Sequence, residues 1–235
     1  MKSSRNIAIT VGVLFLIALI LNLIASEIFK PILNVQDYLV FTYPNKNKII
    51  IGNLLNFICA IAMIFIPITL FPIAKKNNEN LAISYIVFRA LEGILFIFIA
   101  IKTLLFISLS KEYQTAGTQT ISILQTLGKS LQDEISWAAN LYILIFTLGG
   151  ISFYSLLFKA KLIPRVLSIW GIAAVLILLA GAVLGLFGLG LFKSMPLMEG
   201  MVYFAPPIAL NEFVLSIWLI AKGFNSDIHP IKRIK

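Results

Sequence analysis

The sequence predicts an all-α integral membrane protein in which six transmembrane helices form one bundle over residues 1–235. Two observations support this fold class. Of the 235 residues, 60% are hydrophobic and only 12% are charged, whereas a soluble domain carries roughly 25% charged residues. Apolar runs of about 20 residues, the length that crosses a bilayer, recur along the whole chain. Because lipid offers no partners to exposed backbone groups, we expect each run to be a helix.

The first three expected spans cover residues 7–25, 49–73 and 81–109. The first run follows Lys2 and Arg5 and is longer than the signal-peptide core of about 7–15 residues, so we expect an uncleaved helix. The second run carries no charged residue. The third is apolar except for three charged residues, which makes it the span of greatest functional interest.

The last three expected spans cover residues 135–158, 166–192 and 201–223, and a basic cytoplasmic tail follows at 224–235. The fourth run has no charged residue, and the fifth is rich in glycine. The sixth contains Pro206–Pro207. Because proline lacks a backbone N–H and its ring clashes with the preceding turn, this pair must break or start the sixth helix.

Positive charge gathers on one side of the predicted bundle. With the N-terminus inside, the inner segments hold eleven cations and two acids, whereas the outer segments hold six of each. The inner cations are Lys2, Arg5, Lys75, Lys76, Lys159, Lys161, Arg165, Lys222, Lys232, Arg233 and Lys235. The positive-inside rule therefore places both ends in the cytoplasm, with the bundle in the inner (cytoplasmic) membrane. This topology and anionic lipids on the inner face account for the basic charge, so we expect no nucleic-acid binding.

The outer segment between the third and fourth spans has the pattern of an amphipathic helix. Apolar residues recur at helical spacing across 118–135, with polar residues between them. They are Ile121, Leu124, Leu127, Leu131 and Ile135. A helix of this kind lies along the bilayer surface with its apolar face toward the acyl chains. We therefore expect an interfacial helix on the outer surface.

Three charged side chains fall near the middle of the membrane. At a rise of about 1.5 Å per residue, Glu92 and Glu212 each lie about 16 Å from the inner end of their spans, and Arg89 about 12 Å. An ionised side chain costs at least about 2.5–3.5 kcal/mol at this depth, and pairing a guanidinium with a carboxylate lowers that cost. Arg89 and Glu92 share a helix face at i, i+3. We expect Glu212 either to join this cation or to stay protonated.

Three roles are open for this cluster. It is either a clamp that fixes the third helix against the sixth in a structural or regulatory protein, or a binding or proton-carrying site in a small carrier or binder of a small or amphiphilic molecule. If the sixth helix begins at Pro206–Pro207, Glu212 lies in an early turn where the helix dipole favours negative charge, as in transporter sites with broken helices. An intramembrane acid–base enzyme acting on lipid would need a side opening at Glu92. The residues favour a non-enzymatic role.

Asparagines add polar groups to the spans. They are Asn22, Asn53, Asn56, Asn140 and Asn211. Asn53 and Asn56 share a helix face at i, i+3 and, with Asn211, would line a polar cleft that opens outward above Glu212. The alternative is ordinary hydrogen bonding between helices, worth about 0.6 kcal/mol for each bond.

We expect no cofactor and no metal. The only histidine is His229 in the basic tail, which argues against a membrane haem with histidine ligands, and the sequence has no zinc-ligand cluster. The single cysteine, Cys59, permits no intramolecular disulfide. Because it stands in an apolar run, we expect it to be an inert part of the core.

Four motifs resemble those of a known family. They are Phe71-Pro72 with Lys75-Lys76-Asn77-Asn78-Glu79, Phe88-Arg89 with Glu92, Ile163-Pro164-Arg165-Val166-Leu167-Ser168-Ile169-Trp170-Gly171, and Pro207-Ile208-Ala209-Leu210-Asn211-Glu212 with Trp218-Leu219-Ile220-Ala221-Lys222-Gly223-Phe224. Over nearly its whole length the chain is similar to the bacterial family called domain of unknown function 4386. The resemblance implies a multi-pass bacterial membrane protein and supplies no activity, substrate or assigned site.

Overall fold

The computed structural model describes residues 2–194 and 197–225, and most of these residues are helical. Five helices are long and apolar enough to cross a membrane; they are α1 (Lys2–Leu33), α3 (Lys46–Asn77), α4 (Glu79–Thr115), α5 (Thr118–Ala160) and α6 (Arg165–Leu186). A shorter apolar helix, α8 (Pro206–Ala221), follows them. By helix length and composition the chain is a multi-pass membrane protein. Residues 226–235, with His229 and most of the predicted tail, lie outside the described residues.

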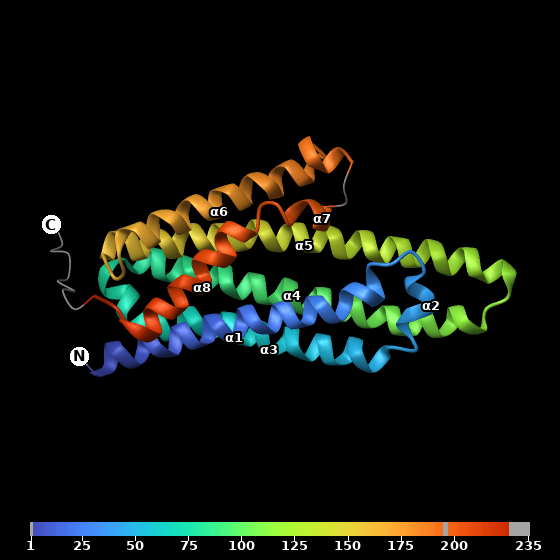
Figure 1. Cartoon of the computed structure of the whole chain (residues 1–235), viewed down its shortest axis with the longest axis horizontal. Helices are drawn as coiled ribbons and strands as arrows, with labels where there is room; N and C mark the ends of the chain where they lie inside the picture. Colours follow the sequence, from blue (N-terminus) through green and yellow to red (C-terminus); the bar gives the residue numbers. More distant parts are fainter. Residues whose placement is uncertain (1, 195–196, 226–235) are drawn as a thin grey trace.

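The helices form a closed ring, which confirms the predicted all-α bundle. Each of the five long helices packs against the next one in the chain, and α8 closes the ring between α6 and α1 (Figure 1). Aromatic side chains fill its interior. The rings of Tyr85 and Phe153 stack with centroids 4.7 Å apart, and Phe15 meets Phe153 at 5.6 Å. This aromatic core brings α1, α4 and α5 together next to the buried charges.

The beginning of α1 and the end of α8 lie at the same end of the bundle (Figure 1). Arg5 joins them, because its Nη1 donates to the carbonyl of Leu219 at 3.3 Å and its Nη2 donates to those of Ile220 at 2.7 Å and Ala221 at 3.2 Å. The last carbonyls of a helix have no partner within the helix and carry its negative dipole end. A guanidinium from α1 therefore caps α8 and holds the ring closed.

The prediction of a separate interfacial helix at 118–135 is wrong, because this segment is continuous with the next span. The segment is helical, but it is the first part of α5, which continues without a break for 43 residues. At about 1.5 Å per residue, α5 is about 65 Å long, roughly twice the hydrocarbon thickness. Figure 1 shows that α4 and α5 extend together beyond α1 and α3. Part of the apolar stripe packs within the protein, where Leu131 contacts Phe106 and Leu39, whereas Leu127 remains 53% exposed.

A short helix, α2 (Tyr38–Thr42), lies against this extension of α4 and α5. The Ser110 hydroxyl of α4 holds it, because this oxygen donates to the carbonyl of Leu39 at 2.5 Å and accepts from the N–H of Tyr43 at 2.8 Å. One side chain thus satisfies two backbone groups of the connection between α1 and α3. The connection is therefore ordered and packs against the side of α4.

The expected fifth span, 166–192, ends earlier than predicted. Helix α6 stops at Leu186 because Gly188 takes the left-handed conformation, with φ of +59°. The N–H of Leu189 then donates to the carbonyl of Leu184, and that of Gly188 to the carbonyl of Gly185. This pair of bonds is the Schellman motif, which glycine favours because it lacks a Cβ. A single 3₁₀ turn, η1 (Gly190–Lys193), follows.

The expected sixth span, 201–223, is divided. The five-residue helix α7 (Leu197–Met201) is followed by a turn, and α8 begins at Pro206. Proline at the first helical position costs nothing, because the N–H at that position has no partner within the helix. A helix that continued through Pro206 would lose a backbone hydrogen bond, and the proline ring would clash with the carbonyl of the preceding turn. The predicted break is therefore present, and α8 with 16 residues is only about 24 Å long.

The Arg5 cap gives a test of ring closure. We expect Arg5→Ala to lower the free energy of unfolding by roughly 1.5–3 kcal/mol, the range for hydrogen bonds to a charged group, because the end of α8 loses its partner. The measurement is detergent-induced unfolding of the purified protein, followed by circular dichroism.

The matched control for the cap is Lys48→Ala, which removes an exposed cation from the first turn of α3 at the other end of the bundle. Equal unfolding midpoints for the two variants would contradict a capping role for Arg5.

Candidate functional site

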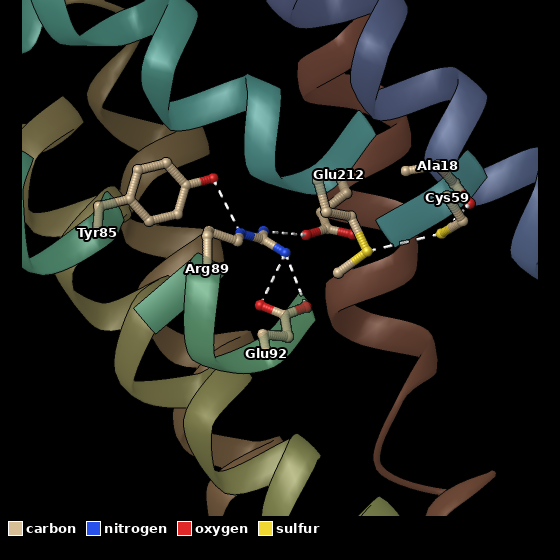
Figure 2. A network of polar contacts seen from close by, with 7 residues as sticks. Ala18, Cys59, Tyr85, Arg89, Glu92 and Glu212 are labelled. Atoms are coloured by element: carbon tan, nitrogen blue, oxygen red, sulfur yellow. Dashed lines mark hydrogen bonds and ion pairs between the residues drawn. The ribbon is translucent and has the colours of Figure 1, made fainter. Parts of the chain in front are cut away.

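The candidate site is built around Arg89 of α4, whose residue surface is only 3% exposed. Figure 2 shows its guanidinium between two carboxylates, Glu92 from α4 and Glu212 from α8. Its Nη1 lies 3.0 Å and 3.1 Å from the two oxygens of Glu92, and its Nη2 lies 3.7 Å from Oε1 of Glu212. The structure therefore brings together the three charged groups that the sequence places at mid-membrane.

Arg89 is also held by aromatic side chains. Its Nε donates to the hydroxyl of Tyr85 at 3.3 Å, one helical turn earlier. Its guanidinium carbon lies 5.4 Å from the centre of the Tyr85 ring and 5.2 Å from that of Phe146. Both distances are within the range of cation–π attraction. The cation is therefore fixed from several sides and has little freedom to reorient.

Glu92 is sealed inside the protein, with 0% of its surface exposed. Its position three residues after Arg89 places both side chains on one face of α4, so the pair forms without any change in the backbone. Both carboxylate oxygens accept from Nη1 of Arg89. Glu92 thus has the contacts of a structural partner. This enclosure argues against acid–base chemistry on a lipid at Glu92.

Glu212 is placed differently. Its side chain is 17% exposed, and 3.7 Å to Arg89 is longer than the 2.7–2.9 Å or so of a charge-assisted hydrogen bond. It is the seventh residue of α8, and the first turn of α8 contains no acid. The expectation that the helix start stabilises Glu212 is therefore wrong, since the dipole effect fades within the first turn.

Beside Glu212 lies a cavity of about 90 Å³, well above the roughly 10–15 Å³ that one water requires. Its lining comes from five helices and is Phe15, Ala18, Leu19, Asn22, Cys59, Met63, Ile66, Arg89, Tyr142, Phe146 and Glu212. The four α1 residues follow i, i+3, i+4 and i+7 spacing, so they form one helical stripe about 10 Å long. The stripe runs from buried Phe15 to exposed Asn22, so the lining of the cavity reaches the protein surface at Asn22.

The asparagines do not form the predicted cleft in the part of the chain that the structure describes. Of the five, only Asn22 lines the cavity. Asn140 donates to the carbonyl of Ala182 at 3.3 Å, and Asn211 to that of Leu167 at 3.1 Å. These two bonds tie α5 and α8 to α6, which is the alternative role. Asn53 donates to a carbonyl of its own helix, and its amide oxygen and that of Asn56 are buried.

Several site residues are not evident from the sequence. Tyr85, Tyr142 and Phe146 complete the surroundings of the charges, but aromatic residues are frequent in the spans. The one available signal is the spacing of Tyr85, four residues before Arg89, which places it on the same helix face. Cys59, expected to be inert, lines the cavity and donates to the carbonyl of Ala18 at 3.3 Å.

Residues 10–223 match the model of the family described as Domain of unknown function (DUF4386). The chain belongs to this family. No curated protein and no solved structure matches the chain. The matched range includes every residue that lines the cavity, so the candidate site lies in the part of the chain that defines this DUF4386 protein.

The two carboxylates are predicted to contribute unequally to stability. Glu92→Gln removes the charge partner of a fully buried cation, and we expect it to cost about 3–5 kcal/mol. Glu212→Gln should cost clearly less, because Glu212 is farther from Arg89 and faces the cavity. Detergent-induced unfolding of both purified variants measures the difference. Similar losses for the two variants, or a larger loss for Glu212→Gln, would be incompatible with this division.

Proposed function

We propose that this protein is a multi-pass protein of the inner (cytoplasmic) membrane, with both ends in the cytoplasm, that binds or carries a small amphiphilic molecule in the cavity beside Glu212. The observation that carries the proposal is the division within the cluster. One carboxylate is sealed against Arg89, and the other faces a cavity. A clamp alone would need only the first.

The grouping of basic residues supports the orientation. The start of α1, the turn between α3 and α4, the turn between α5 and α6 and the end of α8 lie at one end of the bundle (Figure 1). The side chain of Asn225, just after α8, donates to the carbonyl of Lys161 at 2.7 Å and keeps two of these segments together. This end carries the excess of lysine and arginine, which supports the proposed cytoplasmic side under the positive-inside rule and suits contact with anionic lipids.

The lining of the cavity supports an amphiphilic ligand. A polar group at the inner end would meet Glu212 and Arg89, whereas the rest of the wall is mostly apolar, with Leu19, Met63 and Ile66. Ligand sites commonly combine an apolar wall with a few convergent polar groups. Because the cavity reaches exposed Asn22 on α1, a molecule dissolved in the bilayer can enter from the side.

A structural role is the second candidate, and the Arg89–Glu92 pair favours it. A buried pair with good geometry can serve to fix one arrangement of helices. In that case the cavity would have no ligand, and only the loss of Arg89 or Glu92 would destabilise the protein. The two candidates therefore differ in what happens when the cavity is filled.

The native cysteine provides a test, because Cys59 is the only cysteine in the chain and lines the cavity. We expect methyl methanethiosulfonate, a small neutral thiol reagent, to modify Cys59 slowly in nanodiscs at alkaline pH, because only the thiolate reacts and Cys59 is reached only through the cavity. Ala18→Phe should slow this reaction at least about tenfold by filling the cavity, and octanol should slow it by competition in the unchanged protein. Mass spectrometry measures the rate.

The matched control is Ile20→Phe, which adds a similar ring on the exposed side of α1 and should leave the rate unchanged. A rate at Cys59 that responds neither to Ala18→Phe nor to octanol would reject the binding role and leave the structural one.

A further inference from the structure

We propose that the cavity beside Glu212 binds the positively charged head of a small organic amine or quaternary ammonium compound, and that a proton competes with this head for the Glu212 carboxylate. This inference rests on the proposed function, because it names the class of molecule that the same cavity takes. It follows from the charges of the cluster, the saturation of Arg89 and the aromatic walls.

The charge balance favours a cation. The cluster contains one guanidinium and two carboxylates, so with both acids ionised it carries one negative charge in excess. Lys102, the lysine within α4, does not supply the missing positive charge, because its Nζ pairs with Glu134 at 2.5 Å and it lies thirteen residues, about 20 Å, along the helix from Arg89. In a medium of low dielectric constant an unbalanced charge is costly. One more positive charge beside Glu212, from a proton or from a ligand, makes the cluster neutral.

Arg89 is already occupied, which disfavours an anionic ligand. Its Nη1 donates to both oxygens of Glu92, and its Nε donates to the hydroxyl of Tyr85. The centres of two aromatic rings lie within 5.4 Å of the guanidinium carbon. An anion in the cavity would meet only the remaining Nη2 edge and would add a third negative charge. Glu212, by contrast, stands 3.7 Å from that edge and keeps acceptor positions toward the cavity.

The walls suit a cationic head attached to an apolar body. The rings of Phe15, Tyr142 and Phe146 line the cavity, and aromatic rings attract ammonium groups, most strongly when water is excluded. Recognition of quaternary ammonium by a carboxylate and rings needs no donor from the protein. The α1 stripe from Phe15 to Asn22 then gives the apolar body a path toward the side opening.

The competition with a proton follows from the titratable groups around Glu212. From α4 these are Arg89, Glu92 and Tyr85; from α5, Tyr142 and Tyr154; and from α3, Cys59. From α1, the cavity lining contributes the neutral Asn22. One guanidinium serves two carboxylates, so one negative charge of the cluster is uncompensated. Glu212 is the carboxylate that lines the cavity, so it takes either a proton or a cation. Binding of one therefore releases the other, which is the requirement for exchange of an amine for a proton.

Three probes of similar size test the charge. They are phenyltrimethylammonium, its neutral isostere tert-butylbenzene and the anion benzenesulfonate. Binding to the full-length protein in nanodiscs is measured by isothermal titration calorimetry at pH 6, 7 and 8. We expect only phenyltrimethylammonium to bind in a manner that depends on Glu212, with an affinity that rises with pH by up to about tenfold per unit, the limit for release of one proton.

Two variants complete the experiment. Glu212→Gln should weaken phenyltrimethylammonium binding at least about tenfold and remove the pH dependence, whereas Glu134→Gln, which changes an acid outside the cavity, should change neither. The pH series on the unchanged protein remains decisive if Glu212→Gln does not fold, because an affinity that is constant with pH overturns the competition. Stronger Glu212-dependent binding of tert-butylbenzene or benzenesulfonate overturns the cationic class and leaves the proposed function standing. If Ala18→Phe also leaves Cys59 labelling unchanged and no probe binds, the proposed function itself fails.

Discussion

The arrangement of this bundle depends on one buried cation. Arg89 is buried in the part of the bundle that the sequence predicts to lie at mid-membrane, where an uncompensated charge is costly, and the fold surrounds it with groups from three helices. Glu92 comes from the same helix, the Phe146 ring from α5 and Glu212 from α8. Any packing that moved α8 away from α4 would leave Glu212 without its cation. The position of α8 in the ring is therefore tied to this interaction as well as to the apolar core.

The shortness of α8 is the second constraint. Proline at 206 prevents a helix from running through from α7, so this part of the chain does not form one continuous span. At its other end α8 is capped by Arg5 of α1, and on its side Asn211 bonds to α6. These polar contacts fix a helix of 16 residues against two neighbours. They also set the position of Glu212 at the cavity edge.

The sequence is sufficient to predict the all-α class of fold, the long apolar helices and the meeting of Arg89, Glu92 and Glu212. Those predictions rest on two strong effects, which are the length of apolar runs and the cost of buried charge. The sequence is insufficient for features that depend on tertiary partners. The stripe through Leu131 is the same whether it faces lipid or α4, and an asparagine such as Asn140 looks alike in a cleft and in a helix contact. Glu92 is enclosed whereas Glu212 faces the cavity. This difference depends on where α1 and α8 leave space between the helices, which no local sequence pattern encodes.

The most direct test of the central claim is an experimental structure of the protein in nanodiscs at a resolution that shows side chains and ordered water. It should show both oxygens of Glu92 within hydrogen-bond distance of Arg89. The Glu212 carboxylate should lie on the other side of the guanidinium and face density for water or a small molecule. A Glu212 side chain directed toward the acyl chains, or a cavity filled by protein side chains, would contradict the account.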